Sequence, residues 1–354
     1  MSLKTGEKQT LGSFVNKVLA GTAVAIVVAL IPNAILGELF KYLITNHDAT
    51  WLVSLAQAAR IFQFTLSLMA GVMVGIQFKL TPMQSLSVGG AAFIGSGAWK
   101  VIELDGTPIF QLSGTGDMIN TMITAGLAVY AIQLVGHKFG SLNIILLPIV
   151  IGLGVGFIGL LLYPYVSGIT TAFGNLINTF TNLAPLPMSI LIGMSFAFLI
   201  ISPMSTVALG IAIGLNGVSA GAAAMGVAAT TAVLVLSTMR VNKPGVPIAI
   251  ALGSMKMMMP NFFKKPIMIV AMLANAIVCA IPVAIFSISG VPASSGFGLV
   301  GLVGPIASLP GLGLPLMIIC WIVIPFASAF IINYVLVNVV KLYSYDIFKF
   351  EGVQ

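Results

Sequence analysis

Long apolar runs separated by short polar segments dominate the chain. Runs such as 14–43, 142–162 and 316–340 are apolar almost throughout and show none of the two-residue alternation of a half-buried strand. About 20 apolar residues cross a bilayer as a helix, so the runs allow roughly nine or ten crossings. We therefore predict an all-α polytopic membrane protein with about 9–10 transmembrane helices, an internal repeat and broken or re-entrant helical elements.

Two stretches interrupt the apolar runs with the same polar pattern. Thr81 to Ala91 reads TPMQSLSVGGA and Ser202 to Ala212 reads SPMSTVALGIA, at an offset of 121 (202 minus 81). Each opens with a hydroxyl residue followed by Pro, which is a helix-start signal. A repeated, broken, polar element in an apolar chain predicts a duplicated membrane fold with its site between the two halves. Parallel and inverted repeats both remain open.

The spacing of polar segments predicts the organisation of the chain. Residues 99–117 are polar and are expected to form a loop, and the apolar stretch 246–259 is too short to span a bilayer. The expected parts are a cytoplasmic tail (1–13), a first membrane half (14–165, first repeat copy from about 81), an amphipathic interfacial connector (166–184), a second membrane half (185–341, second copy from about 202, re-entrant region about 290–315) and a cytoplasmic tail (342–354).

Composition supports the membrane class. The chain is 59% hydrophobic and only 6% charged, whereas soluble domains carry roughly 25% charged residues. Membrane lipid is therefore the expected solvent for most of the surface. The net charge of +7 comes from basic residues in loops and tails, which is typical of membrane orientation with both termini cytoplasmic and does not favour nucleic acid as a partner.

Acidic residues are missing from most of the chain. There is no Asp or Glu between Met118 and Tyr345, which excludes a carboxylate ion relay or an acid–base pair from that region. His47 and His137 lack neighbours at metal-ligand spacing, so no metal, cofactor or catalytic residue is expected. A ligand there would be bound by hydroxyls, amides and main-chain groups, which suit a sugar, a polyol or an anion at a helix N-terminus.

The candidate solute-binding residues are the hydroxyls and amides of the broken elements. Their alternative role is structural, because Ser and Thr cap helices and hydrogen-bond to nearby carbonyls, and Asn216 equally suits a helix C-terminal cap. The recurrence of the pattern raises the ligand-binding interpretation to the same weight. The candidates are Thr81, Ser85, Ser202, Ser205, Thr206, Asn216, Asn261, Ser294 and Ser295.

Three charged residues add further hypotheses. Arg60 lies within an apolar run, so a charged pair with Asp117 or Glu38 is one interpretation and an arginine reaching the membrane surface is the other. Asp117 is most simply a helix N-cap. Lys256 is expected to face a cytoplasmic vestibule, where it would attract an anion or help to orient the protein.

Four segments carry a family resemblance. SPMSTVALGIAIGLNGVSAGAAAMG, RVNKPGVPIAIALGSMKMMMPNFFKKP, GSGAWK (95–100) and GTGDMIN (114–120) resemble the membrane component (EIIC) of the bacterial sugar phosphotransferase system. The similarity is to the stand-alone branch of perfringolysin-regulator-like membrane proteins. The resemblance implies a homodimer in the bacterial inner membrane, with a dimerising part and a substrate-carrying part that moves between the two faces.

The chain departs from better-known sugar members of that family. Their Gly-Ile-Thr-Glu motif and substrate-site histidine are missing, and no soluble phosphoryl-carrying domain is fused. Coupled phosphorylation would therefore need separate soluble phosphocarrier proteins, with this chain as the permease subunit at most. The leading hypothesis is a transporter of a small polar solute, a sugar or related compound, by alternating access. The alternative is a membrane-embedded ligand sensor or regulatory protein without transport.

Overall fold

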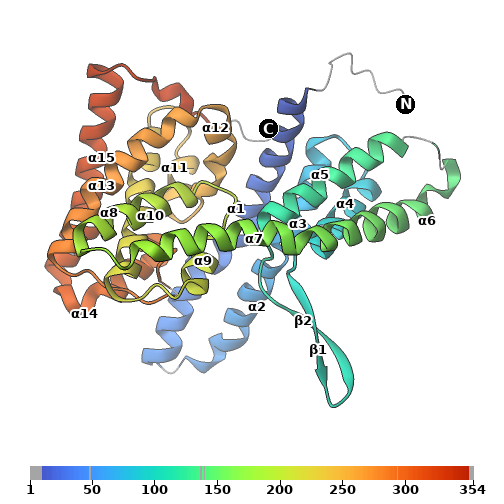
Figure 1. Cartoon of the computed structure of the whole chain (residues 1–354), viewed down its shortest axis with the longest axis horizontal. Helices are drawn as coiled ribbons and strands as arrows, with labels where there is room; N and C mark the ends of the chain where they lie inside the picture. The colour runs from blue at the N-terminus through green and yellow to red at the C-terminus, as the bar shows by residue number, and fades with distance from the viewer. Residues whose placement is uncertain (1–9, 48, 136–137, 139, 293, 351–354) are drawn as a thin grey trace.

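The protein is a helical bundle with one small hairpin (Figure 1). The computed structural model describes residues 10–47, 49–135, 138, 140–292 and 294–350. The expected tails at 1–13 and 342–354 therefore lie in part outside the described residues. Within the described part, six helices are long and apolar enough to cross a membrane, and a seventh crossing is formed if a bent helix pair counts as one. The all-α polytopic class is confirmed.

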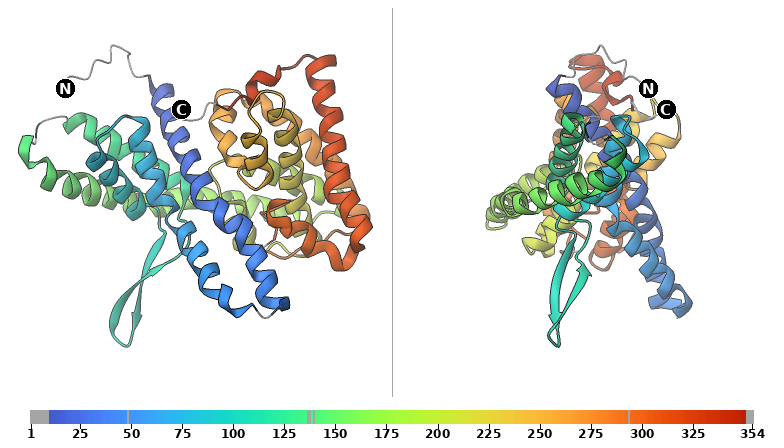
Figure 2. Two further views of the ribbon diagram at one scale, coloured as in Figure 1. Left: turned by 180° about the vertical axis from the view of Figure 1, so that it is seen from behind. Right: turned by 90° about the vertical axis from the view of Figure 1, so that its right-hand side faces the viewer.

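Helix α1 (Leu11–His47) lies between two groups of helices (Figure 2). It contacts α3 (Leu66–Gln77) in the first group. It also contacts three short elements of the second group, which are η4 (Met255–Met258), α12 (Met259–Lys264) and η6 (Val300–Leu302). The sequence therefore folds into two helical groups that share this first helix.

The first group packs around small residues. α3 packs on α4 (Pro82–Gly95), and a Cβ at Gly71 would lie only 2.6 Å from the Val88 carbonyl oxygen, so the two backbones are in close contact. The remaining elements are η1 (Thr50–Leu52), α2 (Val53–Phe64), α5 (Met118–Val135), η2 (Gly140–Leu142), α6 (Asn143–Leu147), η3 (Pro148–Val155) and α7 (Gly156–Phe180). α2 and α3 are bent by 46° to one another.

The stretch 99–117, expected as a loop, instead contains a β-hairpin. Strand β1 (Trp99–Leu104) pairs antiparallel with β2 (Thr107–Leu112). Asp105 and Gly106 form the two-residue turn with φ of 51° and 76°. An Asp-Gly turn of this kind is a strong hairpin signal that the expectation of a loop overlooked.

Helix α7 runs continuously through the residues expected to form a separate connector. With α6 and η3 it makes an apolar helical stretch of 38 residues, Asn143–Phe180, in which Pro164 is accommodated within α7. Figure 1 shows α7 extending from the first group of helices to the second. The segment 166–180 is therefore the second part of a long helix that bridges both groups.

The second group surrounds α10 (Gly217–Thr238), of which almost every residue is buried. Its Ala-rich and Gly-rich sequence lets neighbouring helices approach, since small residues permit close backbone packing. A Cβ at Gly226 would lie 2.0 Å from the Gly193 carbonyl oxygen in α8. The other elements are α8 (Pro185–Leu199), α9 (Thr206–Ala212), α11 (Gly245–Ala251), η5 (Pro266–Met268), α13 (Ile269–Ile285), α14 (Val303–Ile318), η7 (Ile319–Val323), α15 (Ile324–Tyr334), η8 (Val335–Val339) and η9 (Tyr345–Phe348).

The spans are fewer and in two cases longer than the apolar runs suggested. Several apolar segments form helices too short to cross alone, such as the 15-residue α8. Conversely, Val300–Val339 forms one helical stretch of 40 residues with a non-helical kink at Gly313. Within 290–315, the described residues 290–292 and 294–299 are irregular, and Gly301, Leu302 and Gly313 interrupt the helical part with non-helical dihedral angles.

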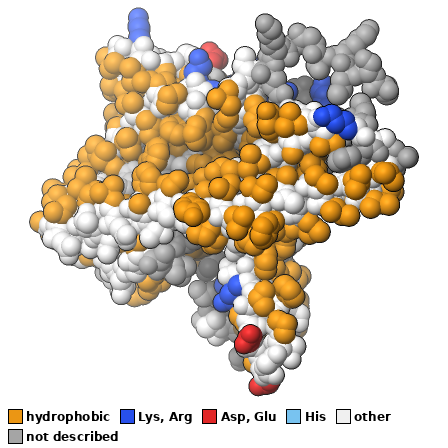
Figure 3. Space-filling model, turned by 45° about the vertical axis from the view of Figure 1, so that its right-hand side comes forward, with side chains coloured by type: hydrophobic (Ala, Val, Ile, Leu, Met, Phe, Trp, Pro, Cys, Tyr) orange, Lys and Arg blue, Asp and Glu red, His pale blue; other side chains and the backbone are white. Residues whose placement is uncertain are grey.

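The surface of the bundle matches a membrane environment. Figure 3 shows hydrophobic side chains over much of the bundle, while the charged atoms visible on this face lie toward its upper end and on the projecting hairpin. The start of α1 and the last described segment lie at the same end of the molecule (Figures 1 and 2). The chain is a multi-pass membrane protein with its hairpin at the opposite end from these termini.

Candidate functional site

The second predicted broken element is broken in the structure. α8 ends at Leu199, residues 200–205 are non-helical, and α9 begins at Thr206. The Ser202 hydroxyl donates to the Leu199 carbonyl over 2.7 Å and accepts from the Met204 N–H over 3.2 Å. These two bonds turn the chain where Pro203 disfavours a helical residue before it. We refer to residues 200–205 as the chain break.

The predicted re-entrant region packs directly against this element. Gly217 and Gly290 exchange two backbone hydrogen bonds of 3.1 and 3.0 Å. The Thr206 hydroxyl donates to the Gly296 carbonyl over 2.9 Å. A Cβ added at Gly296 would lie 2.3 Å from the Val207 nitrogen, so only glycine fits there. We call the contact between residues 202–217 and 290–299 the broken-helix contact.

The predicted serines of the re-entrant region line the same contact. Ser294 and Ser295 are buried, and a Cβ at Gly210 would lie 1.8 Å from the Ser295 hydroxyl oxygen. The Ser295 hydroxyl donates to the Pro292 carbonyl, and the Ser294 hydroxyl donates to the Val291 carbonyl. These hydroxyl oxygens can still accept hydrogen bonds. Thr206 and Ser295 are therefore brought to the same contact, with Ser294 next to Ser295 in the chain. Ser202 and the half-buried Ser205 lie in the chain break that precedes Thr206.

Lys256 also reaches the chain break. Its ammonium nitrogen donates to the main-chain carbonyls of Ser202 and Met204, each over 2.6 Å. The side chain is buried rather than facing an open vestibule, which corrects the sequence-based expectation. Burial lowers the pKa of Lys256 to about 7, because the charged form loses its hydration. Its acceptors are backbone groups, so no sequence motif pointed to this contact.

The first predicted element has a different role. Thr81 is the N-cap of α4 and forms a capping box with Gln84 at the protein surface. Ser85 is buried against α3, where a Cβ at Gly75 would lie 2.8 Å from its hydroxyl oxygen. α4 and α9 lie in different groups of helices (Figure 1). The structure therefore does not bring Thr81 and Ser85 to the broken-helix contact.

The two predicted asparagines serve structural contacts. Asn216 is exposed and is the N-cap of α10, in a capping box with Ser219, rather than the C-terminal cap of the preceding helix. The Asn261 amide donates to the carbonyls of Ile347 and Lys349. It therefore fastens the C-terminal segment to α12.

Within the described residues, Asp117 forms no ion pair with Arg60. Asp117 accepts from the Asn120 N–H as the N-cap of α5 and from the Thr170 hydroxyl over 3.3 Å. Arg60 is exposed on α2 and is not among its partners. The alternative partner, Glu38, has a side chain outside the described part of the structure. Asp117 therefore has the geometry of a helix N-cap.

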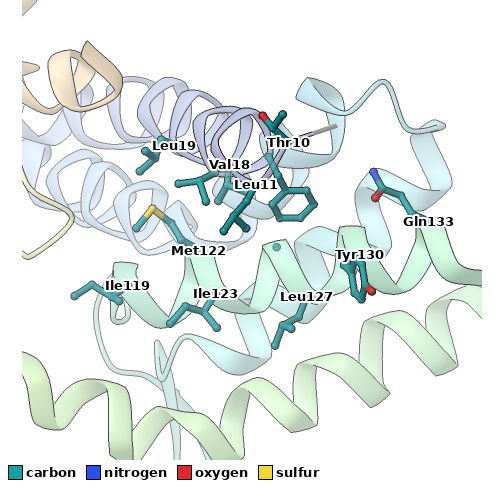
Figure 4. Close-up of a pocket in the computed structure, with 13 residues that line it drawn as sticks. Thr10, Leu11, Val18, Leu19, Ile119, Met122, Ile123, Leu127, Tyr130 and Gln133 are labelled. Atoms are coloured by element: carbon teal, nitrogen blue, oxygen red, sulfur yellow. The ribbon is translucent and has the colours of Figure 1, made fainter. Parts of the chain in front are cut away.

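An apolar groove lies elsewhere, between α1 and α5 (Figure 4). Its volume is about 650 Å³, and none of the predicted solute-binding residues lines it. Within the described residues, no group of three or more His, Cys, Asp or Glu side chains could hold a metal ion.

Comparison with known families assigns the chain. No curated protein and no solved structure matches it significantly. The family model described as "Phosphotransferase system, EIIC" matches residues 16–350, which is nearly the whole chain. Proteins of this family act in the membrane in association with other components of the phosphotransferase system. The chain therefore belongs to the EIIC family of phosphotransferase-system membrane permeases.

Proposed function

We propose that the protein carries a small polar solute, a sugar or a related polyol, across the membrane by alternating access, and that the solute binds at the broken-helix contact. The observation that carries the proposal is the hydrogen bond from Thr206 to Gly296, which joins the two broken elements across 90 residues of sequence. Transporters form their binding sites where broken helices meet in this way.

The chemistry of the contact favours an uncharged solute. Acidic residues are missing from the whole stretch between Met118 and Tyr345. The polar groups at the contact are the hydroxyls of Ser202, Ser205, Thr206, Ser294 and Ser295 and the main-chain groups beside them. A sugar hydroxyl both donates and accepts hydrogen bonds. It can donate to the Ser and Thr oxygens, whose own protons already bond to carbonyls, and to main-chain carbonyl oxygens through their second lone pair.

The mobile part would be the segment that carries the contact. Residues 200–205 interrupt the helix between α8 and α9, and the described residues 290–292 and 294–299 are irregular. Non-helical backbone within a membrane protein is tolerated where it lines a cavity or is buried in protein. Opening of the broken-helix contact toward one face and then the other would expose the same hydroxyls alternately.

The family relationship motivates the wider arrangement. We propose a homodimer in the bacterial inner membrane with both termini cytoplasmic. The basic residues Lys264, Lys265, Lys341 and Lys349 lie in segments near the end that carries the termini, which supports this orientation. If transport is coupled to phosphorylation, separate soluble phosphocarrier proteins would supply the phosphoryl group, in keeping with the association of this family with other phosphotransferase components.

The test starts from detergent-purified protein screened with sugars, polyols and carboxylates by thermal shift, since a ligand that binds the native state raises its apparent stability. The solute with the largest shift is then used for uptake into proteoliposomes. Saturable uptake that is lost in Gly296→Ala and kept in Gly311→Ala supports the proposal. A Cβ at Gly311 meets nothing within 4 Å, which makes it a matched control.

Two outcomes would contradict the proposal. Binding of a solute without saturable flux would favour a membrane sensor, and uptake unaffected by Gly296→Ala would place the site elsewhere. Soluble phosphocarrier proteins with a phosphoryl donor are added to the same vesicles as a separate arm. Accumulation of a phosphorylated solute only in that arm would identify coupled phosphorylation.

A further inference from the structure

Lys256 is a buried cation with main-chain partners. It lies in η4, between the span that ends at Thr238 and the one that begins at Pro266. The flanking side chains of Met255, Met257 and Met258 are also buried. Its ammonium nitrogen is 2.6 Å from the carbonyl oxygens of Ser202 and of Met204. The charge is therefore removed from water and directed at the chain break.

No carboxylate on the described side chains compensates for this charge. η4 packs against α1, α10, α11 and α12. α10 and α11 contain no titratable residue, and α12 contributes Lys264. On α1, the Lys17 ammonium lies over the Phe78 ring at 5.4 Å. The side chains of the other titratable residues of α1 lie outside the described part; they are Glu38, Lys41, Tyr42 and His47. The backbone carbonyl dipoles therefore take the place of a counter-ion.

The carbonyls of a chain break are also the groups that bind small coupling cations in transporters. Unwound backbone at a broken helix presents oxygen atoms that have no partner within the helix, and sodium ions bind to such oxygens. Here the oxygens of Ser202 and Met204 are occupied by the end of a side chain. The ammonium thus occupies the position that a free cation would take if it bound to these two oxygens.

We propose that the ammonium of Lys256 is a tethered occupant of a monovalent-cation site at the chain break, and that protonation of this amine takes the part that sodium binding plays in ion-coupled carriers. This inference rests on the proposed transport function for its meaning, although the site can be tested without a solute. The step is a simple proton equilibrium: the ammonium releases one proton to water and becomes a neutral amine, with no change in any other bond.

Release of the proton weakens the two hydrogen bonds to the chain break while the amine stays buried; complete unfolding, which exposes the amine to water, has the opposite pH dependence. An ammonium forms charge-assisted hydrogen bonds that are roughly twice as strong as those of a neutral donor. A neutral amine would retain N–H donors but lose the charge that attracts both carbonyls. The pKa of about 7 means that both forms are populated near neutral pH. A change of protonation state therefore changes how firmly residues 200–205 are held.

The first experiment measures thermal unfolding in detergent with sodium chloride or choline chloride at equal ionic strength. Lys256→Ala removes the tether and leaves space, so sodium is expected to raise its midpoint by several degrees relative to choline. Lys256→Met fills the space, so no sodium response is expected, and none is expected in the wild type or in Lys243→Ala, an exposed control. A Lys256→Ala protein that responds no more than the wild type overturns the proposal.

The second experiment measures the reactivity of a cysteine placed in the chain break. Ser205→Cys is labelled with a maleimide at pH values from about 6 to 8, around the transition of the amine. The same measurement in Ser205→Cys with Lys256→Met corrects for ionisation of the thiol itself. The ratio of the two rates is expected to rise several-fold with pH, and a flat ratio overturns the proposal.

Background labelling of the native cysteines is measured in parallel. The native cysteines, Cys279 and Cys320, are buried, and the parent protein without the new cysteine measures their residual labelling. Neither experiment contains a transported solute. A failure here therefore rejects the tethered cation alone, whereas absence of solute uptake rejects the proposed transport function.

Discussion

The hydroxyl of Thr206 donates a hydrogen bond to the carbonyl of Gly296 over 2.9 Å. Thr206 begins the short helix α9 after the chain break, and Gly296 lies in the irregular segment before η6. The bond joins two segments that the sequence marked separately as a helix start and a Gly-, Pro- and Ser-rich region. Within the described residues, it joins Thr206 to the segment that carries Ser294 and Ser295, in the second half of the chain.

The first prediction concerns the fit of Gly296. A Cβ there would lie 2.3 Å from the nitrogen of Val207 and 2.5 Å from the carbonyl carbon of Thr206, both of which are backbone atoms. Gly296→Ala is therefore expected to lower the free energy of unfolding by about 1–3 kcal/mol, as overpacking does. Thermal unfolding in detergent measures this against Gly311→Ala, and equal midpoints for the two variants would contradict the close approach.

A second prediction concerns a buried amide in the second group. Asn275 on α13 donates to the carbonyls of Ala229 on α10 and Pro325 on α15 over 2.9 and 3.1 Å, and accepts from the Ser328 hydroxyl. Asn275→Ala leaves these groups without their partner, at an expected cost of about 1–3 kcal/mol. The exposed Asn178→Ala is the control. Equal unfolding midpoints for Asn275→Ala and Asn178→Ala would show that Asn275 does not stabilise the packing of the three helices.

The sequence predicted features that depend on local residue patterns, but not features that depend on tertiary packing. Apolar runs identified the helical class, and the hydroxyl-Pro pattern correctly marked the start of α4 at Thr81. Ser202-Pro203 instead lies in the chain break, and α9 begins only at Thr206. The same pattern did not distinguish a surface cap from a buried contact, because Ser and Thr perform both with the same local chemistry. Thr81 caps a helix at the protein surface whereas its counterpart Ser202 lies in a buried chain break, and this difference comes from tertiary packing, which the local pattern does not encode.

Other features were missed for identifiable reasons. The Asp105-Gly106 turn was present in the sequence but was outweighed by the polarity of its surroundings. The contact of Lys256 with Ser202 and Met204 uses main-chain oxygens, which every residue possesses, so residue types give no indication of it. The merging of apolar runs into long helices reflects the helical conformation retained at Pro164 and other internal prolines.

The third prediction is a pH dependence of stability. The pKa of Lys256 is lowered from 10.5 to about 7 in the folded protein, so between these values the unfolded chain binds more protons and stability rises with pH. Relative to Lys256→Met, the wild type is expected to gain stability from pH 7 upward, by at most about 1.4 kcal/mol per pH unit. Denaturation series at several pH values measure the difference.

The sign of that difference is the decisive feature. Below pH 7 the amine is charged in both states, so its burial cost is constant and the wild type gains nothing from further acidification. A wild type that loses stability relative to Lys256→Met as the pH rises from 7 would contradict the buried, desolvated lysine.

The fourth prediction concerns the C-terminal segment. The amides of Asn242 and Asn261 donate to the carbonyls of Phe348, Ile347 and Lys349, and the Phe348 side chain is fully buried. Asn261→Ala is expected to increase trypsin cleavage after Lys349 roughly tenfold, because cleavage requires local opening of the segment. Mass spectrometry of the product measures the rate. Cleavage as slow as in Asn178→Ala would show that the amide does not hold the segment.

The most direct measurement for the account as a whole is the affinity for the solute found by the thermal-shift screen. Isothermal titration compares Ser295→Ala and Thr206→Val at the broken-helix contact with Ser85→Ala between α3 and α4. We predict a loss of affinity of about tenfold or more for the first two, which is 1.4 kcal/mol, and no change for Ser85→Ala. A weakened Ser85→Ala beside unchanged Ser295→Ala and Thr206→Val would contradict the account.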